Sequence, residues 1–286
     1  MTRERATAFV PGHVTGFFSA HPATDPAVAG SRGAGVTLTD GVEVTVTIDE
    51  SRDADTKQTT NGDPRRVAPV TDVLDTLGVD GAVAIETELP VGAGFGVSGA
   101  AALGAALAAN AAADAGRSEN ELVRIAHEAE VECGTGLGDV VAQARGGVPV
   151  RLDPGAPGYG VIDGIPAHAR VEYVTFGERS TEAVLAGDTT ALSAAGERAL
   201  DRLRADPRLV TLMGASRTFA EEAELLVPAV AEAIDAVDAA TDDDAPGAAM
   251  AMLGRTVFAL GTGLSDAGYD PTVCHTHAAG ARLIGG

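Results

Sequence analysis

The residues whose types and spacing point most clearly to chemistry form a glycine-rich run from Pro90 to Gly99, PVGAGFGVSG. Glycines let backbone amides come close to a phosphate, and a helix that begins beyond them adds partial positive charge. The run is not a Walker A loop, because no Gly-Lys-Ser or Gly-Lys-Thr follows it. A dinucleotide-binding fingerprint would also require an acidic residue about 20 residues later, which is missing. The residues alone therefore predict either a phosphate-binding loop or a structural turn.

Two carboxylates downstream of this run have the chemistry that phosphoryl transfer needs. Asp139 lies in a glycine-flanked loop, where a carboxylate can approach a substrate hydroxyl; the structural alternative is a helix-cap or turn aspartate. Glu130 offers a hard oxygen ligand for Mg²⁺. Glu128 and Glu132 compete for that role, but His127 and Glu130 are three residues apart and share a face beside the apolar stripe. A solvated helix face is the alternative for all three glutamates.

Hydrophobic periodicity places the glycine-rich run between a strand and a helix. Ala82–Leu89 alternates between the two faces of a predicted strand. Val97–Ala113 is nearly all Ala and Leu, which favours a buried helix. Ser118 begins a further helix, because Ser-Glu-Asn-Glu supplies a capping box with Glu121, and this helix ends near Gly134.

The pattern of expected strands and helices changes near residue 160. The Pro- and Gly-rich run 153–160 is the best candidate for a domain boundary. Before it, we expect strands at 35–48 and 148–152, a helix at 67–77 and a turn with an exposed β-ribbon within 49–63. After it, we expect a strand at 171–176, several helices within 180–240, an exposed break at 242–246, an apolar run at 256–260 and a final strand at 281–284.

Three segments together resemble the GHMP kinase superfamily, named for galactokinase, homoserine, mevalonate and phosphomevalonate kinases. Pro90–Gly99 resembles its second motif, in which the loop wraps the ATP phosphates. Gly136-Leu137-Gly138-Asp139, followed by Gly146-Gly147, is similar to the segment that carries the catalytic aspartate. Met252–Ala259 is similar to the third motif, although it lacks the usual glycine cluster.

Two further segments narrow the resemblance to the archaeal pantoate kinases. They are FVPGHVTGFF at Phe9–Phe18 and GSRGAG at Gly30–Gly35. The family implied uses ATP and Mg²⁺ to phosphorylate the terminal hydroxyl of (R)-pantoate, giving 4-phosphopantoate on the route to coenzyme A. Several superfamily members have a lysine in the first motif. This sequence has none there, so any such electrostatic role must pass to an arginine or a histidine, or be absent.

The resemblance implies an α+β fold in two parts. Residues 1–160 would form an S5 domain 2-like N-terminal domain, and residues 161–286 a ferredoxin-like C-terminal domain. The nucleotide would lie between them. A homodimer is suggested by resemblance alone.

The resemblance also implies roles for particular residues. Asp139 would deprotonate or orient the hydroxyl, while Ser98 and Glu130 would hold Mg²⁺. The ATP-binding residues would be Pro90, Gly92, Gly94, Gly96, Val97, Ser98 and Gly99.

Pantoate carries a carboxylate, so its site should offer a cation. Arg151 and His127 are the best candidates, with Ser31 as a hydroxyl partner, because an arginine can bind a carboxylate through two N–H groups. Arg32, Arg145 and His13 remain as weaker alternatives. Two other functions stay open: a kinase of another hydroxy acid or alcohol of the homoserine or mevalonate type, and a nucleotide-binding regulator without catalysis.

The charge balance makes nucleic acid an unsuitable partner. The chain has 41 acidic and 20 basic residues, a formal net charge of −21, and no basic run interleaved with aromatics to reverse that field locally. Lys57 is the single lysine. Such a surface is typical of adaptation to concentrated salt, and an ordinary acidic cytosolic protein is the alternative.

The cysteines and the hydropathy indicate a cytoplasmic protein that does not enter a membrane. Cys133 and Cys274 are far apart and belong to no Cys-x-x-Cys pair, so we expect free thiols in a reducing compartment. No stretch reaches the length of a membrane span without Gly, Pro or charge, and the N-terminal apolar run is too short for a signal peptide. His275 and His277 lie close together, but no partner cluster supports a metal site.

Overall fold

The larger of two sheets is mostly antiparallel, with β3 parallel to β5, and is built around a pair of long strands. The structure is a computed structural model, and it describes residues 4–48, 58–177, 187, 189–242 and 245–285. β1 (Arg5–His21) and β2 (Gly30–Ile48) pair from Arg5↔Thr47 to His21↔Gly30. The strand order is β12-β1-β2-β5-β3-β4, and β6 pairs with the beginning of β2. The other strands of this sheet are β3 (Gln58–Thr60), β4 (Asp63–Pro64), β5 (Gly81–Thr87), β6 (Val148–Asp153), β7 (Val161–Ile165) and β12 (Arg282–Gly285).

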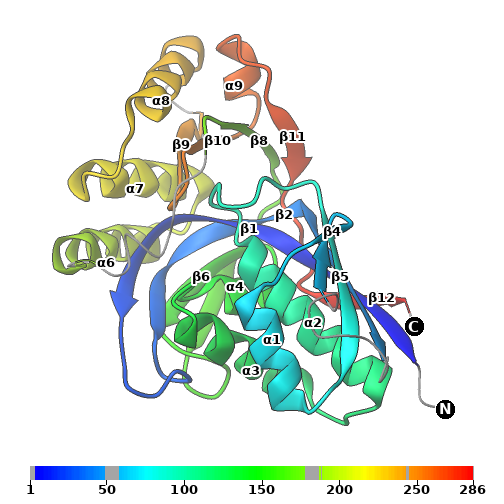
Figure 1. The fold of residues 1–286 in the computed structure, drawn as a ribbon. Helices are drawn as coiled ribbons and strands as arrows, with labels where there is room; N and C mark the ends of the chain where they lie inside the picture. The colour runs from blue at the N-terminus through cyan, green and yellow to red at the C-terminus, as the bar shows by residue number, and fades with distance from the viewer. Residues whose placement is uncertain (1–3, 49–57, 178–186, 188, 243–244, 286) are drawn as a thin grey trace.

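Helices α1 (Ala68–Leu77), α2 (Val97–Ala113), α3 (Glu119–Glu132) and α4 (Asp139–Arg145) gather on one face of this sheet (Figure 1). The predicted Ala-rich helix has the bounds of α2, and most of its side chains are buried, as expected for a helix that is apolar all round. The capping box of Ser118 and Glu121 is present at the start of α3. Both α2 and α4 contact β1, and His13 in β1 meets Phe95, just before α2, and Asp139, the first residue of α4.

The second sheet has the strand order β11-β8-β10-β9, and every pairing in it is antiparallel. Numbered from its own first strand, that order is 4-1-3-2, which is the expected ferredoxin-like layout. Its strands are β8 (Arg170–Thr175), β9 (Ala248–Ala251), β10 (Thr256–Leu260) and β11 (Thr272–His275), and its helices are α6 (Thr190–Ala205), α7 (Leu209–Glu222), α8 (Pro228–Ala240) and α9 (Gly263–Asp266). The α+β prediction is confirmed.

The run 153–160 is the turn of a hairpin. It joins β6 to β7, which pair from Val148↔Ile165 to Asp153↔Val161 within the larger sheet. A division at residue 160 would therefore cut this hairpin, and the chain passes to the second sheet only after Ile165. Pro and Gly mark a chain reversal here, and their content alone did not distinguish a tight turn from a boundary.

Other expectations are met in part. Both cysteines are free thiols. Part of the predicted β-ribbon (residues 49–57), of the helical region (178–186 and 188) and of the exposed break (243–244) lies outside the described residues. Within the part that is described, no helix is long and apolar enough to cross a membrane, and no three His, Cys, Asp or Glu side chains are grouped so that they could hold a metal ion, His275 and His277 included.

Candidate active site

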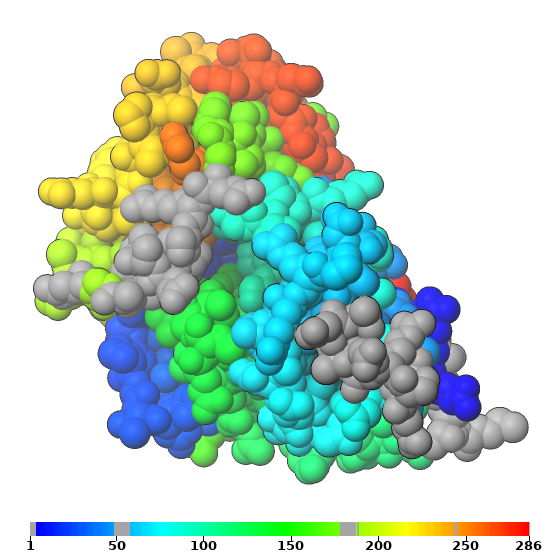
Figure 2. All heavy atoms as spheres, viewed as in Figure 1, coloured from blue at the N-terminus to red at the C-terminus, as the bar shows by residue number. Residues whose placement is uncertain are grey.

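A cavity of about 430 Å³ opens where the starts of α2 and α4 face the second half of the chain. Figure 2 shows the surface hollowed beside the green segments and the cyan-to-teal segments. The residues that line the cavity come from both halves: Thr15, Phe18, Ser31, Arg65, Val91, Gly92, Gly94, Phe95, Gly96, Val97, Ser98, Gly99, Glu130, Thr135, Gly136, Leu137, Gly138, Asp139, Arg151, Met252 and Leu253.

The glycine-rich run forms one wall of this cavity and leads into the first turn of α2. Of its predicted ATP-binding residues, only Pro90 is absent from the cavity lining as the described residues define it. Phe95 anchors the run, since its buried ring lies 4.7 Å from the ring of Tyr173. The N-terminus of α2 therefore faces the cavity through a short, anchored loop, which suits an anion.

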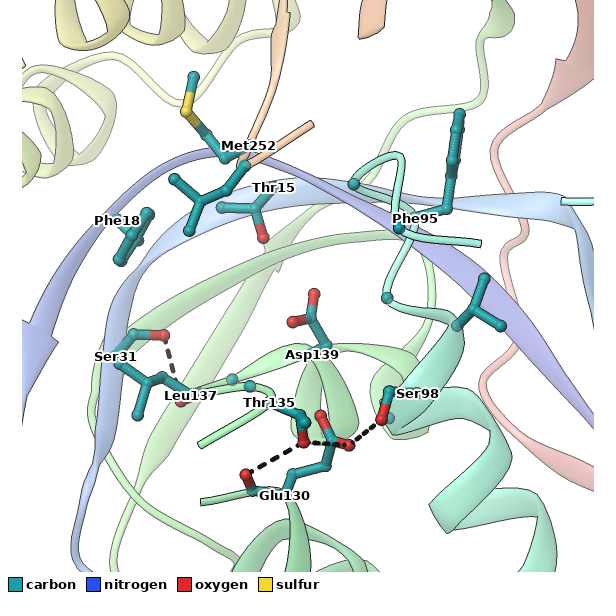
Figure 3. Close-up of a pocket in the computed structure, with 18 of the residues that line it drawn as sticks. Thr15, Phe18, Ser31, Phe95, Ser98, Glu130, Thr135, Leu137, Asp139 and Met252 are labelled. Carbon is teal, nitrogen blue, oxygen red and sulfur yellow. Dashed lines mark hydrogen bonds between the residues drawn. The ribbon is translucent and has the colours of Figure 1, made fainter. Parts of the chain in front are cut away.

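Ser98 and Glu130 lie together, as the resemblance implied. The Ser98 hydroxyl donates to Glu130 Oε1 at 2.5 Å, and Thr135 Oγ1 donates to the same oxygen at 2.9 Å (Figure 3). The Glu130 side chain is 3% exposed, and burial raises its pKa to about 7 despite these hydrogen bonds. Glu128 and Glu132 are more exposed. This set of hard oxygen atoms fits Mg²⁺, which usually takes one or two protein carboxylates and completes its shell with phosphate and water.

Asp139 is the first residue of α4, with Gly138 as its N-cap, and not a loop residue as expected. Its side chain is 27% exposed and points into the cavity (Figure 3). His13 Nδ1 lies 2.7 Å from Asp139 Oδ1. Burial alone would raise the pKa of Asp139, but the hydrogen bond from His13 and the charge of Arg151 hold that pKa below its usual value. Asp139 is thus an ionised carboxylate at neutral pH.

Arg151 and Ser31 stand at the other end of the cavity. Arg151 is 3% exposed, and its Nε and Nη1 have no hydrogen-bond partner among the described residues. A Cβ at Gly138 would lie 2.7 Å from Arg151 Nε, so only glycine fits beside the guanidinium. Ser31 Oγ donates to the Leu137 carbonyl at 3.2 Å. Two unpartnered N–H groups on a buried cation indicate an anionic ligand at this position.

His127 is a predicted substrate-binding residue that the structure does not bring to the cavity. Its buried ring donates from Nε2 to the carbonyl of Ala29 at 2.8 Å, so it supports the segment that leads into β2 and does not line the cavity. Helical spacing correctly placed it on the buried face of α3, but could not show what that face meets. The alternative cations are also engaged elsewhere: Arg32 binds Glu197 at 2.5 Å, and Arg145 donates to the Gly146 carbonyl at 2.9 Å.

The third motif contributes mainly backbone to the site. Met252 and Leu253 line the cavity, and the Met252 amide donates to the Thr15 carbonyl at 3.0 Å. Thr256 Oγ1 donates to the Ala93 carbonyl at 2.8 Å. This segment therefore packs against the glycine-rich loop, with Gly254 close to the Ala93 carbonyl.

Sequence analysis missed two residues at the site. Arg65, just before α1, is an exposed cation at the edge of the cavity. Nothing in the neighbouring sequence indicated that Arg65 would lie at the site. Thr135 binds the Glu130 carboxylate, and its position next to Gly136 in the aspartate-bearing segment was an available signal.

Comparison with known proteins agrees with this geometry. Residues 66–147 match the family model described as the GHMP kinases N-terminal domain. The pantoate kinase of Thermococcus kodakarensis is 36% identical over 264 residues, which span 88% of this chain and 86% of that protein. A solved phosphotransferase related to the CoA biosynthesis pathway is 31% identical, with a TM-score of 0.84 and 98% of both chains covered. A structure solved with AMPPCP and magnesium shares the fold at 16% identity, with a TM-score of 0.76 and 99% of both chains covered.

The fold is that of the GHMP kinase class. Within that class, the chain belongs to the pantoate kinase family. The resemblance stated from the sequence is confirmed.

Proposed function

We propose that the chain transfers the γ-phosphoryl group of ATP to the terminal hydroxyl of (R)-pantoate and forms 4-phosphopantoate. The observation that carries this proposal is a single cavity that combines a glycine-rich helix start, the Asp139 carboxylate and a buried arginine with unpartnered N–H groups. These features match the phosphates of ATP and the hydroxyl and carboxylate of pantoate. The relative from Thermococcus kodakarensis supports the same substrate.

The glycine-rich loop and the first turn of α2 would bind the triphosphate, because their amides and the helix N-terminus attract anions. Ser98 and Glu130 would hold Mg²⁺, with Thr135 orienting the Glu130 carboxylate. When bound, the ion neutralises charge on the phosphate oxygens. Arg65 would add positive charge at the edge of the cavity, where the strongly acidic protein otherwise repels ATP.

Arg151 and Ser31 would bind pantoate. The guanidinium can donate two N–H groups to the carboxylate, and the Ser31 hydroxyl can bond a polar oxygen beside it. Holding that end of the substrate would direct the terminal hydroxyl toward Asp139, at the centre of the cavity between Arg151 and the glycine-rich loop.

Asp139 would act on the hydroxyl as it attacks. The hydroxyl oxygen forms a bond to the γ-phosphorus, the bond from that phosphorus to the bridging oxygen of ADP breaks, and the hydroxyl proton passes to the Asp139 carboxylate. Because Asp139 is ionised at neutral pH, it can accept this proton without a prior step. Positioning and charge neutralisation supply most of the rate enhancement in such a transfer.

The test is ADP release with Mg-ATP and pantoate, pantothenate, homoserine or mevalonate, for the wild type, Asp139→Ala and the exposed-site control Asp201→Ala. We expect turnover with pantoate alone, a loss of at least about 100-fold in kcat for Asp139→Ala, and wild-type rates for the control. Turnover of homoserine or mevalonate would contradict the substrate assignment. Binding of ATP without turnover of any alcohol would favour a regulator.

A further inference from the structure

His13 is a buried histidine in β1, and one of its ring nitrogens contacts Asp139, which lines the catalytic cavity. Its side chain is 0% exposed, and Nδ1 lies 2.7 Å from Asp139 Oδ1. Nε2 is also buried and has no hydrogen-bond partner among the described residues. On the neighbouring strand, a Cβ at Gly35 would lie only 2.6 Å from Nε2, so this side of the ring packs closely against the Gly35 backbone. The two nitrogens therefore have different surroundings.

These surroundings fix the protonation state of the ring. A charged imidazolium would need an acceptor for Nε2–H, and a buried N–H without one is costly. Burial lowers the pKa of His13 more than the hydrogen bond and charge of Asp139 raise it, and the charge of Arg151 lowers it further. From α3, Glu130 also interacts electrostatically with Asp139. The ring is thus neutral and carries its proton on Nδ1, so it donates to Asp139.

The backbone of His13 is attached to the phosphate-binding loop. The His13 amide donates to the carbonyl of Phe95 at 3.0 Å. One turn after Asp139, the buried Gln143 donates from Nε2 to the carbonyl of Gly96 at 2.9 Å. The donor to Asp139 and the loop that would hold ATP consequently belong to one hydrogen-bonded frame.

We propose that His13 is the positioning residue of Asp139: its neutral ring holds Oδ1 by a fixed Nδ1–H donor and leaves Oδ2 for the acceptor hydroxyl. The inference rests on the proposed function in assigning the hydroxyl to Asp139. It also gives the lysine-free first motif a role, since a neutral donor takes the place of a cation there. An uncharged donor orients the Asp139 carboxylate and lowers its pKa less than a cation at the same distance would.

Three variants test this role. His13→Ala removes the donor, His13→Asn can place an amide N–H near the position of Nδ1, and Val14→Ala removes buried volume from the same strand without touching Asp139. We expect His13→Ala to lower kcat by up to about 100-fold, with little change in KM for ATP, because the Asp139 carboxylate that meets the substrate hydroxyl is no longer held in place. As the pH is lowered, kcat of His13→Ala should begin to fall at a higher pH than kcat of the wild type, because losing the hydrogen bond raises the pKa of Asp139. His13→Asn should recover most of the rate, and Val14→Ala should keep the wild-type pH profile.

A second readout does not depend on turnover. Long-range ¹⁵N–¹H correlation spectra of the ligand-free protein distinguish the two tautomers of a histidine ring, and the His13 signals are identified by their loss in His13→Asn. We expect the Nδ1–H form at neutral pH, because burial lowers the pKa of His13. An Nε2–H ring, a ring charged at neutral pH, or a folded His13→Ala enzyme with the wild-type rate and pH profile would overturn the proposal. If the wild type fails to phosphorylate pantoate, the proposed function fails, while the spectrum still decides the pairing.

Discussion

Replacing Arg151 with methionine should weaken pantoate turnover and at the same time stabilise the ligand-free protein. Methionine keeps much of the apolar stem but removes the guanidinium. That group is 3% exposed, and two of its nitrogens have no partner among the described residues. The free protein therefore contains a buried cation with two N–H-bearing nitrogens that no described residue pairs.

The effect on turnover follows from the lost contact with the substrate carboxylate. Truncating one partner of a buried, hydrogen-bonded charge pair costs about 2–5 kcal/mol. At about 1.4 kcal/mol for each factor of ten, kcat/KM for pantoate should fall by about 30- to 5,000-fold. The amide of pantoate has no carboxylate charge, so the same substitution should reduce its turnover by less than about fivefold.

The effect on stability has the opposite sign. An unsatisfied buried donor destabilises the folded protein by about 1–3 kcal/mol, so removing two of them should stabilise it by about 2–6 kcal/mol. The attraction between Arg151 and Asp139 is lost at the same time, which makes the net stabilisation smaller. Unfolding 286 residues at about 2.1 cal/mol/K each gives about 0.6 kcal/mol/K. A net gain of about 2 kcal/mol would then raise Tm by about 3 °C.

The assay compares ADP release with pantoate and with its amide, and adds the thermal unfolding of each ligand-free protein. Arg145→Met is the matched control, because that arginine is exposed and lies outside the catalytic cavity; it should leave both turnover and substrate preference unchanged. Equal losses for pantoate and its amide in Arg151→Met would refute the carboxylate assignment. A lower Tm would refute the reasoning that the guanidinium is uncompensated in the free protein.

Three further predictions concern charge at and around the cavity. Burial raises the pKa of Glu130 to about 7, so the ionised fraction changes about tenfold between pH 6 and pH 8. The affinity for Mg²⁺, measured by titration calorimetry with a non-hydrolysable ATP analogue, should weaken by about that factor at the lower pH, and Glu130→Gln should remove this dependence. Arg65→Ala should raise KM for ATP about 3- to 10-fold in 0.1 M KCl and less in 2 M KCl, because an exposed cation is screened by salt; KM for pantoate should stay constant. The net charge of −21 should make Tm rise between 0.1 and 2 M KCl as self-repulsion is screened.

Each of these has a clear contrary result. Mg²⁺ affinity that is equal at pH 6 and pH 8 would exclude Glu130 as a ligand of the ion. A change in KM for pantoate in Arg65→Ala would place that arginine at the acceptor and not at ATP. A Tm that falls or stays level in KCl would leave the acidic surface without a role in salt tolerance.

Local patterns in the sequence predicted most of the elements that frame the site. The strand at 82–89, the helix at 97–113 and the capping box at Ser118 are local features, because each depends on residues a few positions apart. The burial of Glu130, with Glu128 and Glu132 more exposed, also followed from helical spacing. Such features need no knowledge of which segments meet in the folded chain.

Contacts between distant segments could not be predicted in this way. His13 and Asp139 are 126 positions apart, and only the placement of α4 against β1 brings them together. His127 was nominated as a cation for the pantoate carboxylate, and in the structure its ring meets the carbonyl of Ala29, 98 positions away. The hairpin at 153–160 was missed for a related reason, since the pairing of β6 with β7 is what makes that run a turn.

The continuity of β1 has a consequence for how the molecule can move. One half of this strand contributes Val10 to the core beneath α2, and the other half contributes Phe17 and Phe18 to the core shared with the second sheet. Its ladder with β2 extends along both halves, so rotating one half against the other would break hydrogen bonds in the middle of a sheet. Within the described residues, β1 therefore joins the two halves as one continuous strand and is not a flexible linker between them. We expect admission of ATP and departure of ADP to depend on small movements at the edge of the cavity, while Ser98, Glu130 and Asp139 keep their places.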